Sequence, residues 1–170
     1  MILAIDPGPV ESAYVMWDGQ RVHEFGKEPN SSVLVYVRAS RSLLHMSGLV
    51  IEMIASYGMP VGAEVFETCV WIGRFMEAFG ADRCHRIPRI QVKSHLCHSG
   101  KATDANIRQA IIDRFGGNAT AIGKKKAPGP LYGVSGDVWA ALAVALTYWD
   151  QQQARMREAD MAIIGATVQL

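Results

Sequence analysis

Three acidic residues lie in sequence settings where carboxylates are uncommon. Asp6 follows the apolar run Ile-Leu-Ala-Ile, Glu52 lies inside Leu-Val-Ile-Glu-Met-Ile, and Asp137 opens a segment rich in alanine, leucine and valine. Taking a carboxylate out of water is costly unless a partner compensates its charge. A divalent cation is such a partner, and oxygen-only ligands favour Mg²⁺ or Mn²⁺ over zinc. Two ions about 4 Å apart activate water and stabilise the leaving 3′ oxygen of a phosphodiester.

Each acid also has a purely structural interpretation. Asp6 begins Asp-Pro-Gly, which is a turn sequence, and Asp137 is suited to the first turn of a helix, where a negative charge favours the helix dipole. Glu52 is the hardest to explain in this way, because no neighbour in the sequence neutralises it.

The segments around these acids predict the elements that position them. Apolar runs and turn signals, including Asp18-Gly19, predict strands at 1–5, 13–17, 21–25, 49–54 and 84–87. Helical spacing and end signals predict helices at 33–46, 60–79, 103–115 and 136–149, the last extending toward 157. The three lysines, two prolines and two glycines of 124–133 predict a loop.

This order of elements predicts an α/β fold with a mixed five-stranded sheet, in which a three-strand antiparallel meander is followed by parallel strands. Asp6 and Glu52 then lie side by side at the carboxyl edge of the sheet, where open α/β sheets place their sites. We expect one domain over 1–160 and a tail over 161–170.

Several short motifs, taken in order, resemble the RuvC family of Holliday junction resolvases in the RNase H-like superfamily. They are Ile2-Leu-Ala-Ile-Asp6-Pro-Gly8, Ile51-Glu52, Gln91-Val-Lys93 and the segment from Asp137 to Thr147. The resemblance runs from residue 2 to about residue 150. It implies a Mg²⁺-dependent endonuclease acting on branched DNA, with Asp6, Glu52 and Asp137 as metal ligands. Lys93 would face the scissile phosphate.

The sequence departs from this family at one position. The family's last helix usually carries two acids three residues apart, and Ala140 stands at the second of these positions. Glu11, Glu64 and Glu67 are candidates to replace the missing ligand, although the last two have the character of solvated helix charges. Without a fourth ligand, the chain could instead be a branched-DNA binding protein with an impaired site.

The net charge of +1 conceals two opposite regions. Residues 83–126 contain ten lysines and arginines and only two acids, Asp104 and Asp113, which gives +8, and the remainder carries −7. Such a separation creates a local positive field for a polyanion. We expect contacts with the DNA backbone from the basic residues Arg89, Lys101, Lys124, Lys125 and Lys126.

Aromatic residues suggest further contacts. Tyr57 follows Glu52 closely and could stack on an unpaired base, or it could be structural. Trp71, Phe75 and Phe79 lie at helical spacing and suit either the core or a dimer interface. The family's helix in this region contributes to a homodimer, and a two-fold junction favours a two-fold enzyme.

The sequence also contains features of two other classes of function. Cys84, His85, His95, Cys97 and His98 carry zinc-ligand chemistry, but their spacing matches no usual zinc module. An actin-like ATPase or sugar kinase also begins with an acid-bearing strand and hairpins, but needs a second such domain, for which 170 residues leave no room.

The composition predicts the cellular location. No apolar run approaches the roughly 18 residues of a membrane span, and the first acid comes too early for a secretory signal. Three cysteines argue against a disulfide framework and favour a reducing compartment, so we expect a cytoplasmic protein without membrane partners.

Overall fold

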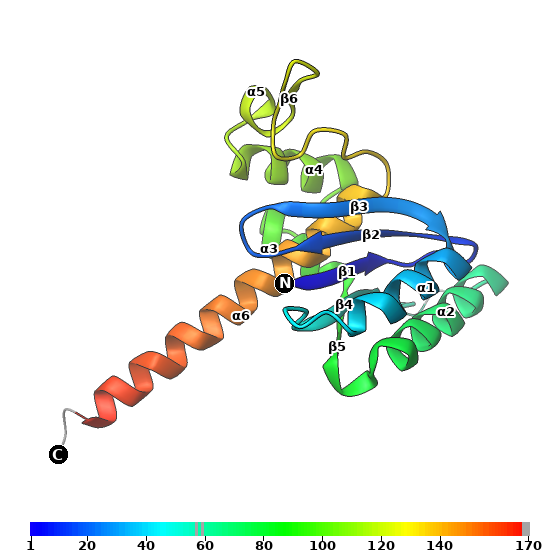
Figure 1. Ribbon diagram of the computed structural model, residues 1–170, viewed down its shortest axis with the longest axis horizontal. Helices are drawn as coiled ribbons and strands as arrows, with labels where there is room; N and C mark the ends of the chain where they lie inside the picture. The colour runs from blue at the N-terminus through cyan, green and yellow to red at the C-terminus, as the bar shows by residue number, and fades with distance from the viewer. Residues whose placement is uncertain (57, 59, 168–170) are drawn as a thin grey trace.

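The centre of the structure is a five-stranded mixed sheet with helices on both faces (Figure 1). The computed structural model describes residues 1–56, 58 and 60–167. In the order β3-β2-β1-β4-β5, the meander pairs antiparallel, and β4 and β5 add in parallel. The strands are β1 (Ile2–Asp6), β2 (Glu11–Trp17), β3 (Val22–Pro29), β4 (Gly48–Met53) and β5 (Cys84–Pro88). The predicted mixed sheet is confirmed.

The helices form two layers. Helices α1 and α2 cover one face of the sheet, while α3, α4 and the first part of α6 cover the other (Figure 1). Their bounds are α1 (Asn30–Arg41), α2 (Ala63–Phe79), α3 (Arg89–Cys97), α4 (Asp104–Arg114), α5 (Asn118–Ala121) and α6 (Val138–Thr167). A 3-10 turn, η1 (Ala81–Arg83), precedes β5, and a small hairpin of β6 (Gly123–Lys124) and β7 (Ala127–Pro128) follows α5.

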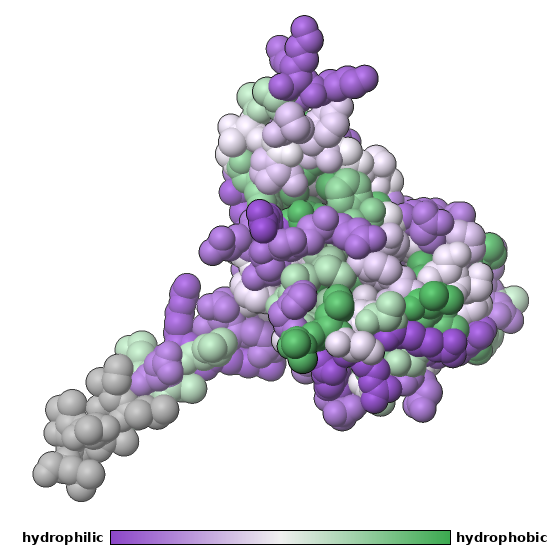
Figure 2. Space-filling model, viewed as in Figure 1, coloured by the Kyte–Doolittle hydropathy of each residue, from purple (hydrophilic) through white to green (hydrophobic). Residues whose placement is uncertain are grey.

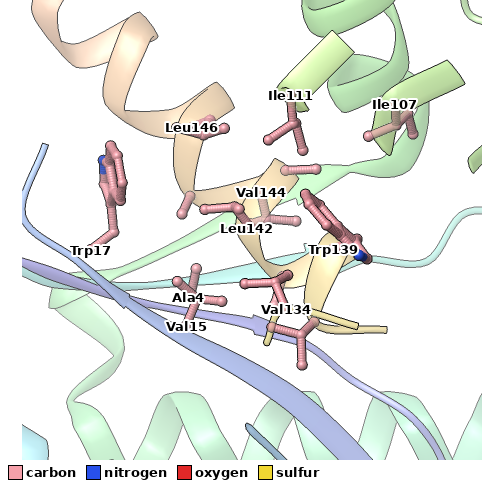
Figure 3. Packing of buried hydrophobic residues seen from close by; sticks show 14 of the residues in the cluster. Ala4, Val15, Trp17, Ile107, Ile111, Val134, Trp139, Leu142, Val144 and Leu146 are labelled. Atoms are coloured by element: carbon pink, nitrogen blue, oxygen red, sulfur yellow. The ribbon is translucent and has the colours of Figure 1, made fainter. Parts of the chain in front are cut away.

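Strand alternation divides the buried residues into two cores. On β1, Ile2 and Ala4 face α6, whereas Leu3 and Ile5 face α1 and α2. The core on the α6 side joins Val15 and Trp17 of β2 to Leu142 and Leu146 of α6 (Figure 3). Because successive side chains of a strand point to opposite faces, Asp6 continues the row of Ile2 and Ala4 toward α6.

Helix α2 contributes its aromatic residues mainly to the core. Phe75 and Phe79 are fully buried against the sheet, and Trp71 packs partly buried beside Phe75. The other side of α2 leaves Phe66 62% and Val70 55% exposed, which is a high fraction for large apolar side chains.

Several elements differ from the expectations. Helix α3 begins directly after the proline that ends β5, and it buries only Val92, so it leaves no apolar period in the sequence. The lysine-rich loop contains the β6–β7 hairpin, whose two-residue strands are too short to produce a pattern. Helix α6 continues through Thr167, so the expected tail from residue 161 begins as helix.

Within the described residues, no helix is both long and apolar enough to cross a bilayer.

Asp150 of α6 is hydrogen-bonded to the other two helices of its layer. Its Oδ2 accepts hydrogen bonds from His95 Nε2 at 2.8 Å and Arg114 Nη1 at 2.6 Å, and Arg114 Nη2 donates to Oδ1 at 2.8 Å. Helices α3, α4 and α6 thus meet at one carboxylate. Burial, the largest influence, raises the pKa of Asp150, but the hydrogen bonds from Arg114 and His95 outweigh it and lower the pKa below its ordinary 3.8.

Asp150→Asn should therefore destabilise the protein by about 1–2 kcal/mol at neutral pH, since a two-pronged charged pair is lost at a half-buried position. A carboxylate with a lowered pKa stabilises the fold above its unfolded pKa, and this contribution disappears as the pH falls through the folded value. Urea unfolding at neutral pH and near pH 3 should show the difference shrinking in acid. Asp160→Asn, on the exposed part of α6, is the control and should change little. A difference that grows in acid would contradict this role.

Candidate active site

Asp6 and Glu52 end up on the same face of the sheet at neighbouring strand ends. The parallel register of β1 and β4 sets Ile5 opposite Ile51, so the next residue on each strand is an acid. Glu52 follows Val50 and Asp6 follows Ala4 on the face that packs against α6. Glu52 is only 8% exposed. The predicted pair of adjacent acids at the carboxyl edge is therefore present in the structure.

The turn after Asp6 is fixed by close packing and a buried polar network. A Cβ atom on Gly8 would lie 2.4 Å from the carbonyl oxygen of Glu11, so this position requires glycine. Asn30 Nδ2 donates to the Gly8 carbonyl at 2.9 Å, and the Ser12 hydroxyl donates to Asn30 Oδ1. The Asp-Pro-Gly sequence thus serves a structural purpose as well as presenting Asp6.

Asp137 reaches the same edge from the residue before α6. It is exposed, and Lys27 Nζ from β3 lies 2.8 Å from its Oδ2. The same ammonium lies 3.5 Å from Glu11 Oε2. The hydrogen bond and charge of Asp137 raise the pKa of Lys27, so this lysine stays charged beside the site.

Arg89, the first residue of α3, connects Glu52 to a further acid. Its Nη1 donates to both carboxylate oxygens of Glu52 at 2.9 Å. Its Nη2 donates to Oδ1 of Asp104, the first residue of α4. The side chain of Thr103 caps α4 and, with Asn106, forms a capping box that fixes where Asp104 begins the helix.

The surroundings of Asp6 disfavour its charged form. Burial, followed by the negative charge of Glu52, raises the pKa of Asp6 to about 7. The charges of Asp137 and Asp104 also raise it, whereas that of Arg89 lowers it. Burial likewise raises the pKa of Glu52, and Arg89 opposes the shift. The raised pKa of Asp6 shows that its negative charge is not fully compensated, and a cation at this point would supply the compensation.

A pocket of about 90 Å³ lies between these groups. Its lining combines the charged groups with the start of α6 and one side of α4: Asp6, Arg89, Asp104, Ile107, Gly136, Asp137, Trp139 and Ala140. Three acids thus line one pocket, Asp6 from β1, Asp104 from α4 and Asp137 from the residue before α6, and Arg89 links Glu52 to it.

The donor set fits a divalent cation in its chemistry, because it consists of carboxylate oxygens, the ligands that Mg²⁺ and Mn²⁺ prefer. As the side chains stand, no three acidic, histidine or cysteine residues in the described part of the chain are grouped to hold an ion. Arg89 and Lys27 instead hold Glu52 and Asp137. A metal at this site would therefore have to displace both of these cations.

Comparison with known proteins decides the fold. A solved structure of Thermus thermophilus RuvC superimposes with a TM-score of 0.59 at 20% identity, covering 90% of this chain and 96% of that one. The chain has the RuvC fold. A second structure, T. thermophilus RuvC in complex with Holliday junction substrate, gives a TM-score of 0.56 at 21% identity, covering 86% and 90%. No protein-family model matches the sequence, and the search of curated proteins finds no match.

Only some of the residues that the resemblance assigns to the site line the pocket. Asp6, Asp137 and Ala140 line the pocket, and Ala140 lies one turn along α6 from Asp137. Lys93 lies one turn after Arg89 on α3, close enough for its charge to lower the pKa of Glu52. The roles of these residues remain predictions.

The residues expected to contact DNA lie in three different places. Arg89 is inside the carboxylate group rather than on an outer basic track. Lys101 is exposed beside the groove between α3 and α4. Lys124, Lys125 and Lys126 are exposed on the β6–β7 hairpin, which projects beyond α4 and α5 and away from the sheet (Figure 1); hydrophilic side chains extend from this end of the molecule in Figure 2. Tyr57 lies outside the described residues.

The three candidates to replace the missing ligand lie in different parts of the structure. Glu11 is exposed at the start of β2 and shares Lys27 with Asp137. Glu64 and Glu67 are exposed on α2, which covers the opposite face of the sheet. Of the three, Glu11 alone therefore lies near Asp137.

Three of the five residues with zinc-ligand chemistry contact other groups. His95 is hydrogen-bonded to Asp150, His85 stacks on Tyr148, and the Cys84 thiol donates to the Gly80 carbonyl. His98 ends α3 with a left-handed backbone, φ 54°.

Sequence reasoning missed Lys27, the role of Asp104 and the inward position of Arg89. Lys27 comes from a strand that is distant in sequence, and its position depends on the β2–β3 register, which sets it opposite Ala13. Asp104 did carry a signal, because it is one of only two acids in the basic segment 83–126.

Replacement of Asn30 tests the network that holds the turn after Asp6. Asn30→Ala removes two hydrogen bonds from a side chain that is 1% exposed, so it should cost about 1–3 kcal/mol of unfolding free energy. Urea unfolding measures the change. The matched control is Asn118→Ala at the exposed start of α5, which should cost much less. Equal losses in the two variants would show that the network contributes nothing specific.

Proposed function

We propose that this protein is a Mg²⁺- or Mn²⁺-dependent endonuclease that cleaves Holliday junctions or other branched DNA during recombination or replication. The main support is the convergence of Asp6 and Glu52 from adjacent parallel strands, with Asp137, at one edge of a RuvC-type sheet. A structural neighbour with the same fold is bound to a Holliday junction, which favours branched DNA as the substrate.

In this proposal Asp6, Glu52 and Asp137 hold the ions, two in each site. When bound, such ions activate water and stabilise the leaving 3′ oxygen of a phosphodiester. The buried position of Glu52 gives that ligand a fixed orientation on β4, and the polar network around Gly8 does the same for Asp6.

Basic side chains position the DNA and stabilise its charge. Lys93 projects from α3 near Glu52 and would stabilise the negative charge that develops at the phosphate. Lys101 and the hairpin lysines would contact the backbone farther along the duplex arms, which positions the strand without reading its sequence.

A homodimer completes the proposal. A four-way junction has two equivalent strands to cut, so two copies related by a two-fold axis would present one site to each. The exposed Phe66 and Val70 on α2 provide apolar surface suited to such contact. The three free cysteines are consistent with a reducing, cytoplasmic location.

The alternative is a branched-DNA binding protein with an impaired site. It is favoured by Ala140 at the second acid position and by the pairing of Arg89 and Lys27 with the remaining carboxylates. The two functions differ in one measurable respect, which is whether the bound junction is cut.

Cleavage of a synthetic four-way junction with Mg²⁺ or Mn²⁺ tests the proposal. Wild type should cut, and Asp6→Asn should lose at least about 100-fold in rate while still binding the junction, because loss of a ligand weakens the metal. Asp113→Asn is the matched control: Asp113 is exposed on α4, and its side chain accepts a hydrogen bond from Gln109 on the same helix. Binding without cutting by wild type would support the impaired-site alternative, and equal cutting by Asp6→Asn would refute the assignment of the metal site.

The hairpin lysines should contribute to the salt dependence of junction binding. Replacing Lys124, Lys125 and Lys126 with alanine should reduce the slope of log K against log salt by up to about 2.7, because up to three fewer counterions are released. Fluorescence anisotropy over a salt series measures the slope. Replacing Arg38, Arg41 and Arg74 with glutamine is the control, because it removes the same charge from a groove on the α1–α2 face. An unchanged slope in the lysine variant would exclude backbone contact by the hairpin.

A further inference from the structure

Helix α6 carries one carboxylate where the resemblance predicts two. Asp137 precedes the helix, and Ala140, one turn later, has no group that can bind a cation. Both residues line the 90 Å³ pocket, so the position that a second acid would occupy on α6 opens onto that pocket.

Helix α4 brings an acid to the same pocket from the other side. Asp104 lies in the pocket lining with Asp6, Asp137 and Ala140. The capping box of Thr103 and Asn106 fixes the first turn of α4, and the buried Ile107 and Ile111 anchor that helix in the core. Asp104 is therefore held at the pocket by the packing of its helix.

A cation already joins Asp104 to the buried acid of β4. The guanidinium of Arg89 donates through one nitrogen to both oxygens of Glu52 and through the other to Asp104. The two carboxylates thus lie within the span of one guanidinium group. This bridge shows that the carboxylates of Asp104 and Glu52 are close to each other.

We propose that Asp104 supplies the fourth carboxylate of the metal site, in place of the acid missing at Ala140, and that Arg89 occupies this position when no metal is bound. The inference rests on the proposed metal-dependent function. It moves the fourth ligand from the last helix to the start of α4, so an alanine at position 140 need not weaken the site.

Binding of Mn²⁺ to the purified full chain, followed by calorimetry and by the electron paramagnetic resonance of free Mn²⁺, tests this assignment without any cleavage assay. Asp104→Asn should weaken the affinity for at least one ion by about 10-fold or more. Asp113→Asn, on the same helix but directed away from the pocket, should bind as wild type does. Wild-type affinity in Asp104→Asn would overturn the proposal.

The double variant Asp104→Asn with Ala140→Asp separates a ligand from a residue that merely orients Arg89. A carboxylate restored on α6 should recover Mn²⁺ affinity, because it returns a ligand to the same pocket. It cannot restore the contact between Asp104 and Arg89. Failure of the double variant to recover affinity, in a protein that unfolds at the same urea concentration as the single variant, would mean that Asp104 acts only through Arg89.

Asp6→Asn distinguishes failure of this inference from failure of the proposed function. Loss of Mn²⁺ binding in Asp6→Asn together with full binding in Asp104→Asn would reject only the role of Asp104. Full binding in both variants would reject the carboxylate site itself.

Discussion

The structure of the site depends on the parallel pairing of β1 and β4, which sets two carboxylates side by side on a face that is otherwise apolar. Like charges that are both withdrawn from water repel each other strongly, and burial of Asp6 and Glu52 raises the pKa of both. The surrounding elements supply the compensation: Arg89 contacts Glu52 from the first residue of α3, which starts immediately after the strand beside β4. The sheet thus buries negative charge, and the cation at the start of the adjoining helix compensates part of it.

The elements that could be predicted from the sequence are those with a strong local signal. The first and fourth strands are continuous apolar runs because both of their faces are buried, and Phe75 and Phe79 mark α2 because its inner side packs on the sheet. Helix α3 gave no such signal. Only Val92 on it is buried, and its fold is determined by contacts with α4 and α6 rather than by its own periodicity. A helix held by distant neighbours is not visible in a local pattern.

The difference between a local sequence signal and contacts with other elements also applies to the residues of the site. Asp6, Glu52 and Asp137 could be found because each contradicts its apolar surroundings, which is a property of the sequence alone. Their partners could not be found in this way, because the contact of Lys27 with Asp137 depends on strand register and that of Asp104 with Arg89 on how two helices approach. Asp104 nevertheless stood out because it is an acid within a basic segment. A charge that lies within a segment of opposite sign can therefore help to identify the partners of a site.

The segregation of charge along the chain has a different meaning once the contacts are known. Residues 83–126 carry +8, but Arg89 is committed to Glu52 and Asp104, and Arg114 to Asp150, so part of this charge neutralises the protein rather than attracting DNA. The lysines of the β6–β7 hairpin, in contrast, are exposed, and the hairpin itself projects from the body (Figure 1). Under the proposed function, an ion that takes over Glu52 and Asp104 also releases Arg89. The charge at the pocket would then rise by that of the ion, and the freed guanidinium could donate to a phosphate that approaches there.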